Sequence, residues 1–103
     1  IISGGENVYS GEVEAALRSH PEVVDVAVIG VPDARWGESV HAVVVLRNGA
    51  VPGDGELQAA LTNWCRRELA GYKCPRSMNF VDALPMSAAG KVLKTVLRDS
   101  LRA

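Results

Sequence analysis

The chain has 103 residues, a length that suits one domain with a modest hydrophobic core. Eleven Lys and Arg residues against 12 Asp and Glu residues leave a net charge of -1, so charge gives no reason to expect nucleic acid or an anionic membrane as a partner. The longest apolar run, residues 42–46, is far shorter than the roughly 20 residues of a membrane span. We therefore expect a cytoplasmic protein without a membrane span.

Two cysteines, Cys65 and Cys74, match no common metal motif and are too few for a disulfide framework. We expect both to be reduced thiols and expect no metal site. The chain opens on Ile1-Ile2-Ser3, with no initiator Met, basic region or signal-like core, which indicates a fragment boundary.

Hydrophobic periodicity and turn residues divide the chain into alternating helical and extended segments. The expected elements are a tight turn at residues 3–7, a helix at 10–19, strands at 23–29 and 39–46, a helix at about 55–69, a short strand at 77–81 and a C-terminal helix at 92–101. Ser10 and Asp54 are expected to cap the first two helices, and Gly71 to follow the second. Residues 30–33 are expected to break the first strand.

Adjacent β runs, with helices before, between and after them, predict an α+β fold. We expect a single domain in which a small, mostly antiparallel sheet packs with helices as a two-layer sandwich. His20, before a proline at a helix end, is expected to be a capping or surface residue, and His41, inside an apolar strand, is expected to be structural. Their spacing supports no Ser-His-Asp or Cys-His catalytic arrangement.

Two of the turns could carry chemistry. Paired Gly4 and Gly5 let a backbone approach a narrow ligand, or simply turn sharply, and taken alone the turn is favoured. In the next loop, Trp36 can stack on a flat ring while Arg35 meets phosphate. Equally, Trp36 can fold over the edge of the core, since tryptophan is usually largely buried.

Two later segments present lysines. Tyr72 and Lys73, with Arg76 close behind, could bind a nucleotide-like group or form a solvated basic turn. Lys91 follows a loop of small residues ending in Gly90, at the apparent start of the last helix. It could be delivered to a partner active site as a point charge for phosphate and carboxylate oxygens, although chemistry alone favours an ordinary surface lysine.

Taken in order, three motifs resemble the C-terminal domain of the adenylate-forming (AMP-binding) superfamily. They are ISGGENVY followed by EVE at residues 2–14, VIGVPDARWGE at 28–38 and LPMSAAGKVLK at 84–94. The resemblance covers essentially the whole chain and is closest to acyl-CoA synthetases and fatty-acid–CoA ligases. It implies that residues 1–103 form a lid domain, with a hinge and an N-terminal ATP- and acid-binding domain before Ile1. The isolated lid is then expected to be inactive.

The resemblance also implies roles for individual residues. Lys91 corresponds to the catalytic lysine of adenylation, with Gly90 supporting its loop. Gly4 and Gly5 correspond to the loop that lines the pantetheine tunnel, supported by Glu6, Asn7 and Tyr9. Trp36 and Tyr72 fall near the expected CoA adenine, and Lys73 or Arg76 near its phosphates. The implied ligands are ATP with magnesium, held mainly by the missing domain, and coenzyme A as co-substrate.

Two positions depart from the family pattern. Ser10 stands where proline commonly follows the tyrosine of the first motif, and Cys74 stands where relatives often carry a basic or aliphatic residue. Two other functions stay open: the lid of a peptide-synthetase module that loads a carrier protein, and a non-catalytic α+β binding module. Acylation of Lys91, which removes its charge, is a further regulatory hypothesis.

Overall fold

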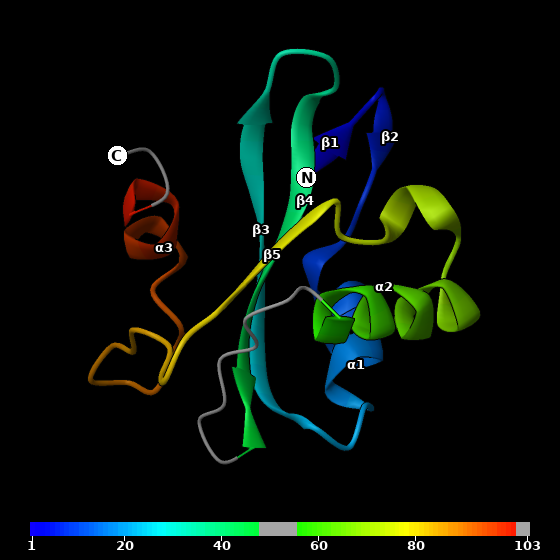
Figure 1. The fold of residues 1–103 in the computed structure, drawn as a ribbon. Helices are drawn as coiled ribbons and strands as arrows, with labels where there is room; N and C mark the ends of the chain where they lie inside the picture. The colour runs from blue at the N-terminus through cyan, green and yellow to red at the C-terminus, as the bar shows by residue number, and fades with distance from the viewer. Residues whose placement is uncertain (48–55, 101–103) are drawn as a thin grey trace.

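The computed structural model describes residues 1–47 and 56–100, which form one open sheet with helices on both faces (Figure 1). Its elements are β1 (Ile2–Ser3), β2 (Glu6–Asn7), α1 (Ser10–Arg18), β3 (Val23–Asp33), β4 (Gly37–Leu46), α2 (Glu56–Glu68), β5 (Ser77–Phe80) and α3 (Lys94–Ser100), with a 3-10 turn at Gly71–Lys73 before β5. The expected cap at Asp54 and the end of the last expected helix lie outside the described residues.

Strand β4 organises the sheet. It forms a long antiparallel hairpin with β3, from Val23 opposite Leu46 to Asp33 opposite Gly37. Its other edge pairs antiparallel with β1 at Gly37 and parallel with β5 at residues 41–44. β1 and β2 form a small hairpin of their own. The predicted α+β fold with a mostly antiparallel sheet is therefore confirmed.

Both faces of the β3–β4 hairpin are covered, which explains why these strands read as continuous apolar runs rather than alternating ones. Helices α1 and α2 pack on one face, while α3 and the segment before it lie on the opposite side (Figure 1). Alternate strand residues serve the two cores: Val26 and Val28 join the α1–α2 side, whereas Ala27 and Ile29 join the α3 side. The helical layer predicted on one face thus has a second, smaller layer opposite it.

The predicted break at residues 30–33 is wrong, because β3 continues through Pro32 to Asp33. The N–H of Val28 points away from β4, since it donates to Glu14. Pro32 lies four residues further along the same strand, so its nitrogen faces the same outer edge. The N–H that proline lacks would therefore not have bonded β4. Gly30 fits because the Glu38 side chain crosses it: a Cβ there would come 2.5 Å from a Glu38 carboxylate oxygen.

Two predicted helix starts also differ. Ser10 is the first residue of α1 rather than its cap; Tyr9 occupies the capping position without a side-chain hydrogen bond. The last helix begins at Lys94 instead of residue 92, because Val92 pairs with Met86 in an antiparallel bridge. Lys91 consequently lies in a turn, three residues before the helix.

No helix within residues 1–47 and 56–100 has the length and apolar character needed to cross a membrane. The same residues contain no cluster of three or more His, Cys, Asp or Glu side chains arranged to hold a metal ion.

Candidate functional site

The glycine hairpin and the Trp36 loop meet at one end of the sheet. Gly4 and Gly5 both adopt positive φ, at 58° and 83°, and the Gly4 N–H donates to the Trp36 carbonyl over 2.9 Å. A Cβ on Gly4 would lie 2.8 Å from the indole ring, whereas a Cβ on Gly5 would meet nothing within 4 Å. Gly4 therefore makes room for Trp36, and Gly5 leaves a bare stretch of backbone facing outward.

Trp36 is held by its own loop and covered by arginine. Asp33 Oδ1 accepts the N–H groups of both Arg35 and Trp36, which fixes the turn. The Arg76 guanidinium lies 4.3 Å from the centre of the indole ring and that of Arg35 lies 5.0 Å away. The half-buried Trp36 therefore packs against the hairpin, as one of the two interpretations expected, and its ring also lies beside two cations.

Lys73 has an internal partner that sequence spacing did not reveal. Its Nζ donates to Glu12 Oε1 over 2.9 Å and lies 5.8 Å from the centre of the Tyr72 ring. The hydrogen bond to Glu12 raises the pKa of Lys73. Sixty-one residues separate this pair, so only the fold brings them together.

A cavity of about 610 Å³ lies between α2 and the segment before β5. Arg66 and Arg76 line it together with Cys74, and none of the described residues that line it carries a carboxylate. Neither arginine makes an ion pair within the described residues. Arg66 and Arg76 are thus available to an anionic ligand at this end of the domain, in addition to Arg35 beside Trp36.

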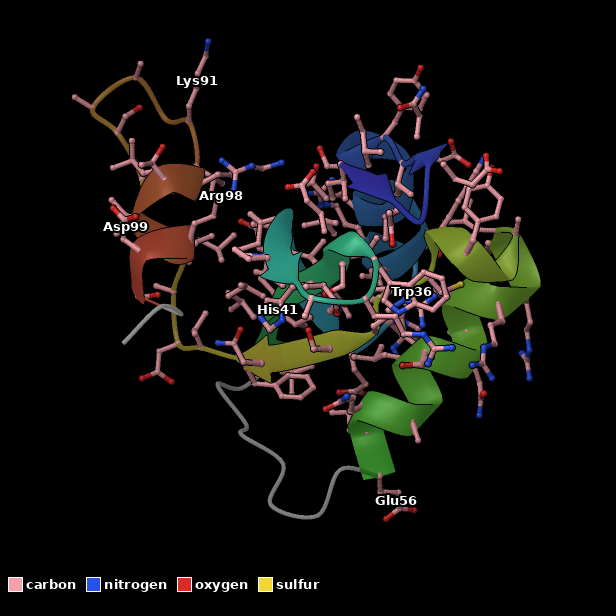
Figure 2. All side chains as sticks on the ribbon, turned by 90° about the horizontal axis from the view of Figure 1, so that it is seen from above. Trp36, His41, Glu56, Lys91, Arg98 and Asp99 are labelled. Atoms are coloured by element: carbon pink, nitrogen blue, oxygen red, sulfur yellow. The ribbon has the colours of Figure 1, made fainter. Side chains whose placement is uncertain are left out.

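Lys91 stands apart from this cluster, at the edge of the molecule, with its side chain directed away from the ribbon (Figure 2). Its turn is closed by three hydrogen bonds: Ser87 N–H to the Lys91 carbonyl at 2.8 Å, Gly90 N–H to the Ser87 carbonyl at 2.9 Å, and Lys91 N–H to Ser87 Oγ at 3.2 Å. Gly90 supplies the positive φ of 80° that the turn requires. Lys91 is exposed and has no carboxylate partner in the described part of the chain.

The other residues singled out in the sequence lie in the glycine hairpin, in the strands and at a helix end. Glu6 and Asn7 form the exposed strand β2, and Tyr9 is 69% exposed beside the glycine hairpin. His41 is buried, with Nδ1 2.6 Å from Ser77 Oγ and Nε2 2.6 Å from Asn79 Oδ1, which fits a structural role. His20 packs edge-on against Trp64 and accepts the Glu22 N–H at Nδ1.

Both cysteines are free and buried, as expected for reduced thiols. Burial, together with the neighbouring Cys74, raises the pKa of the Cys65 thiol to about 12. Because alkylation requires the thiolate, Cys65 in the native protein should resist iodoacetamide at pH 8. Peptide mass spectrometry checks this, with the urea-unfolded chain as control; equally fast labelling of both forms would contradict the buried placement.

Comparison with known proteins decides the family. The sequence model described as "AMP-binding enzyme C-terminal domain" matches residues 12–91. The chain belongs to this family. The AMP-binding C-terminal domain match takes in α1 from Glu12 onward, the Trp36 loop and the turn that ends on Lys91.

Three similar proteins of this C-terminal domain family are named as CoA synthases, synthetases or ligases. A feruloyl-CoA synthase of Amycolatopsis sp is 52% identical over 95% of this chain and 19% of its own length. A medium/long-chain-fatty-acid–CoA/3-oxocholest-4-en-26-oate–CoA ligase of Mycobacterium tuberculosis is 54% identical over 88% of this chain and 16% of its own. The structure of a Mycobacterium tuberculosis fatty acyl CoA synthetase superposes with a TM-score of 0.85 at 46% identity, covering 97% of this chain and 19% of that protein. The chain thus spans about a fifth of the length of these relatives.

Proposed function

We propose that residues 1–103 are the mobile lid of an ATP-dependent acyl-CoA ligase, which converts a carboxylic acid, most simply a fatty acid, into acyl-AMP and then acyl-CoA. A larger N-terminal domain before the hinge would bind ATP, its magnesium ion and the acid. The lid alone would be inactive, and the enzyme cytoplasmic. The family match and the names of the CoA-ligase relatives support this proposal.

The observation that carries the proposal is the presentation of Lys91. A solvated ammonium group on a hydrogen-bonded turn, with no carboxylate partner among the described residues, is ready to enter a site on another domain. Lys73 and Lys94, the other lysines of the chain, are both paired with glutamates of α1. Lys91 is therefore the lysine best suited to meet the carboxylate of the acid and the α-phosphate of ATP.

The role that we assign to Lys91 is electrostatic. Adenylation joins a carboxylate oxygen to the α-phosphorus and releases pyrophosphate, so two anionic groups must approach each other. A positioned ammonium group in a closed, water-poor site stabilises the charge that develops there far better than it would in bulk water. Lys91 needs neither to form a covalent bond nor to lose its proton in this step.

The second half-reaction would use the opposite end of the domain. Gly5 offers bare backbone for a narrow pantetheine arm, with Gly4 and Trp36 directly behind it. Trp36 and Tyr72 would lie near the nucleotide end of CoA. Arg76 stacks on Trp36 and has no carboxylate partner in the described structure, so it would meet the CoA phosphates. Lys73 would contribute only by leaving Glu12.

The test is to assay the two half-reactions separately in the full-length protein, with and without Lys91. Acid-dependent ATP–pyrophosphate exchange reports adenylation, and CoA thioester formed from supplied acyl-adenylate reports transfer. Loss of exchange alone on removing Lys91 supports the proposal; unchanged exchange would reject it. Transfer to a carrier-protein thiol in place of CoA would favour the peptide-synthetase alternative.

Gly5→Leu should block transfer while sparing adenylation. The new side chain would fill the open space beside the hairpin and displace the pantetheine thiol, and misplacement by about 1 Å costs roughly 100-fold in rate. Gly5→Ala is the matched control, since it carries the same backbone strain at a φ of 83° but adds little bulk. Equal transfer rates for the two variants would remove Gly5 from the tunnel.

A further inference from the structure

Lys94 ties α3 to α1 around the edge of the sheet. It is the first residue of α3, three positions after Lys91. Its Nζ lies 3.1 Å from Glu14 Oε2 and 3.2 Å from Ser10 Oγ, and both of these residues belong to α1. Because α1 and α3 cover opposite faces of the sheet, this contact must pass around β3, the strand at the edge (Figure 1).

Glu14 is itself anchored to that edge. The oxygen that meets Lys94 also accepts the N–H of Val28, in the middle of β3, over 2.9 Å. The side chains of Lys94 and Glu14 are 31% and 17% exposed. The side chains of the Arg18–Asp25 pair, which links α1 to β3, are 52% and 41% exposed. Solvent therefore screens the Lys94–Glu14 pair less than the Arg18–Asp25 pair.

The Lys91 turn joins this anchor directly. The Leu93 N–H donates to the Pro85 carbonyl over 2.8 Å, which closes the base of the turn one residue before Lys94. A closed turn moves as one body, so its direction depends on what holds its base. On the chain that enters and leaves the turn, its base is held by apolar contacts of Leu84, Val92 and Leu97 with the core and by the polar contact of Lys94.

We propose that Lys94 is a positioning residue for adenylation, which aims the Lys91 turn by fixing its base to Glu14. The proposal rests on the proposed role of Lys91. Apolar contacts alone hold a turn against the core without fixing its rotation, because they are non-directional. The contacts of Lys94 with Glu14, and of Glu14 with Val28, fix the orientation of the turn. They should therefore affect only adenylation, the half-reaction in which we propose that Lys91 takes part.

The test is Lys94→Met in the full-length protein, which keeps the aliphatic stem and removes the ammonium group. We expect kcat for ATP–pyrophosphate exchange to fall by roughly 10- to 100-fold, with little change in the KM values of ATP and acid, because Lys91 is present but misplaced. Thioester formation from supplied acyl-adenylate should stay within about twofold of wild type. Lys94→Arg, which keeps the charge and can still reach Glu14, should restore most of the exchange activity.

Arg18→Met is the matched control. Arg18 bonds Asp25 and the carbonyl of Val26, so it ties α1 to the same edge strand, but it makes no contact with the Lys91 turn. This variant should keep both half-reactions. Wild-type exchange in Lys94→Met, an equal fall in both half-reactions, or the same loss in Arg18→Met would overturn the inference. Lys91→Ala separates the two ideas: if it abolishes exchange while Lys94→Met does not, only the positioning role fails.

Discussion

Lys91→Ala in the full-length protein should lower the rate of ATP–pyrophosphate exchange by about 100- to 1000-fold, the usual effect of removing one preorganised group that stabilises developing charge. The turn that carries Lys91 is closed by backbone hydrogen bonds and by Ser87 Oγ, so truncating the side chain should leave its shape intact. Thioester formation from supplied acyl-adenylate should survive, because the role proposed for Lys91 is confined to adenylation.

Two further variants sharpen this measurement. Lys91→Arg keeps the positive charge but replaces a compact ammonium group by a planar fork, and it should recover only part of the exchange rate. Arg98→Ala removes an exposed cation from α3, close in sequence to Lys91, and should have no effect. A comparable loss in Arg98→Ala would mean that the overall charge of this segment matters, rather than the position of Lys91.

Acylated Lys91 should behave as Lys91→Ala, and normal exchange in the acetylated protein would reject a regulatory switch.

Leu17→Ala should strongly destabilise the domain. Leu17 is completely buried on the inner face of α1, in the larger of the two cores. A leucine-to-alanine change at such a position costs about 2–5 kcal/mol, against the 5–15 kcal/mol that typically stabilises a domain. Urea unfolding of the chain measures the loss. Val96→Ala, at a side chain 49% exposed on α3, should change stability by no more than about 0.5 kcal/mol.

The strands and the α+β class followed from local pattern, because β-branched runs and turn residues act over a few neighbours. The strand break predicted at residues 30–33 failed since it treated glycine and proline as interruptions wherever they occur. Pro32 sits on an edge strand with its nitrogen turned outward, and Gly30 makes room for Glu38 from the facing strand. Both reasons depend on which strand lies beside which, and the local sequence does not contain that information.

For the candidate site, too, some residues could be predicted from the sequence and others could not. Gly4, Gly5 and Lys91 could be found from motifs, and the structure places them in turns that suit the proposed roles. Lys73 and Trp36 have partners that lie far away in the sequence: Glu12 accepts a hydrogen bond from Lys73, and Arg76 stacks on Trp36. Lys94 was available as a signal, three residues after Lys91, but its partner Glu14 is 80 positions away in the sequence.

The edge of β3 has a consequence for how the domain behaves in solution. An open strand edge is a template on which another chain can add a strand, and aggregation often begins there. Here the Val28 N–H is bonded to Glu14, the Val26 carbonyl to Arg18 and the Val26 N–H to Asp25, while Pro32 offers no donor at all. Side chains therefore occupy several of the groups that a second strand would need, which disfavours joining of two copies of this domain sheet to sheet through β3.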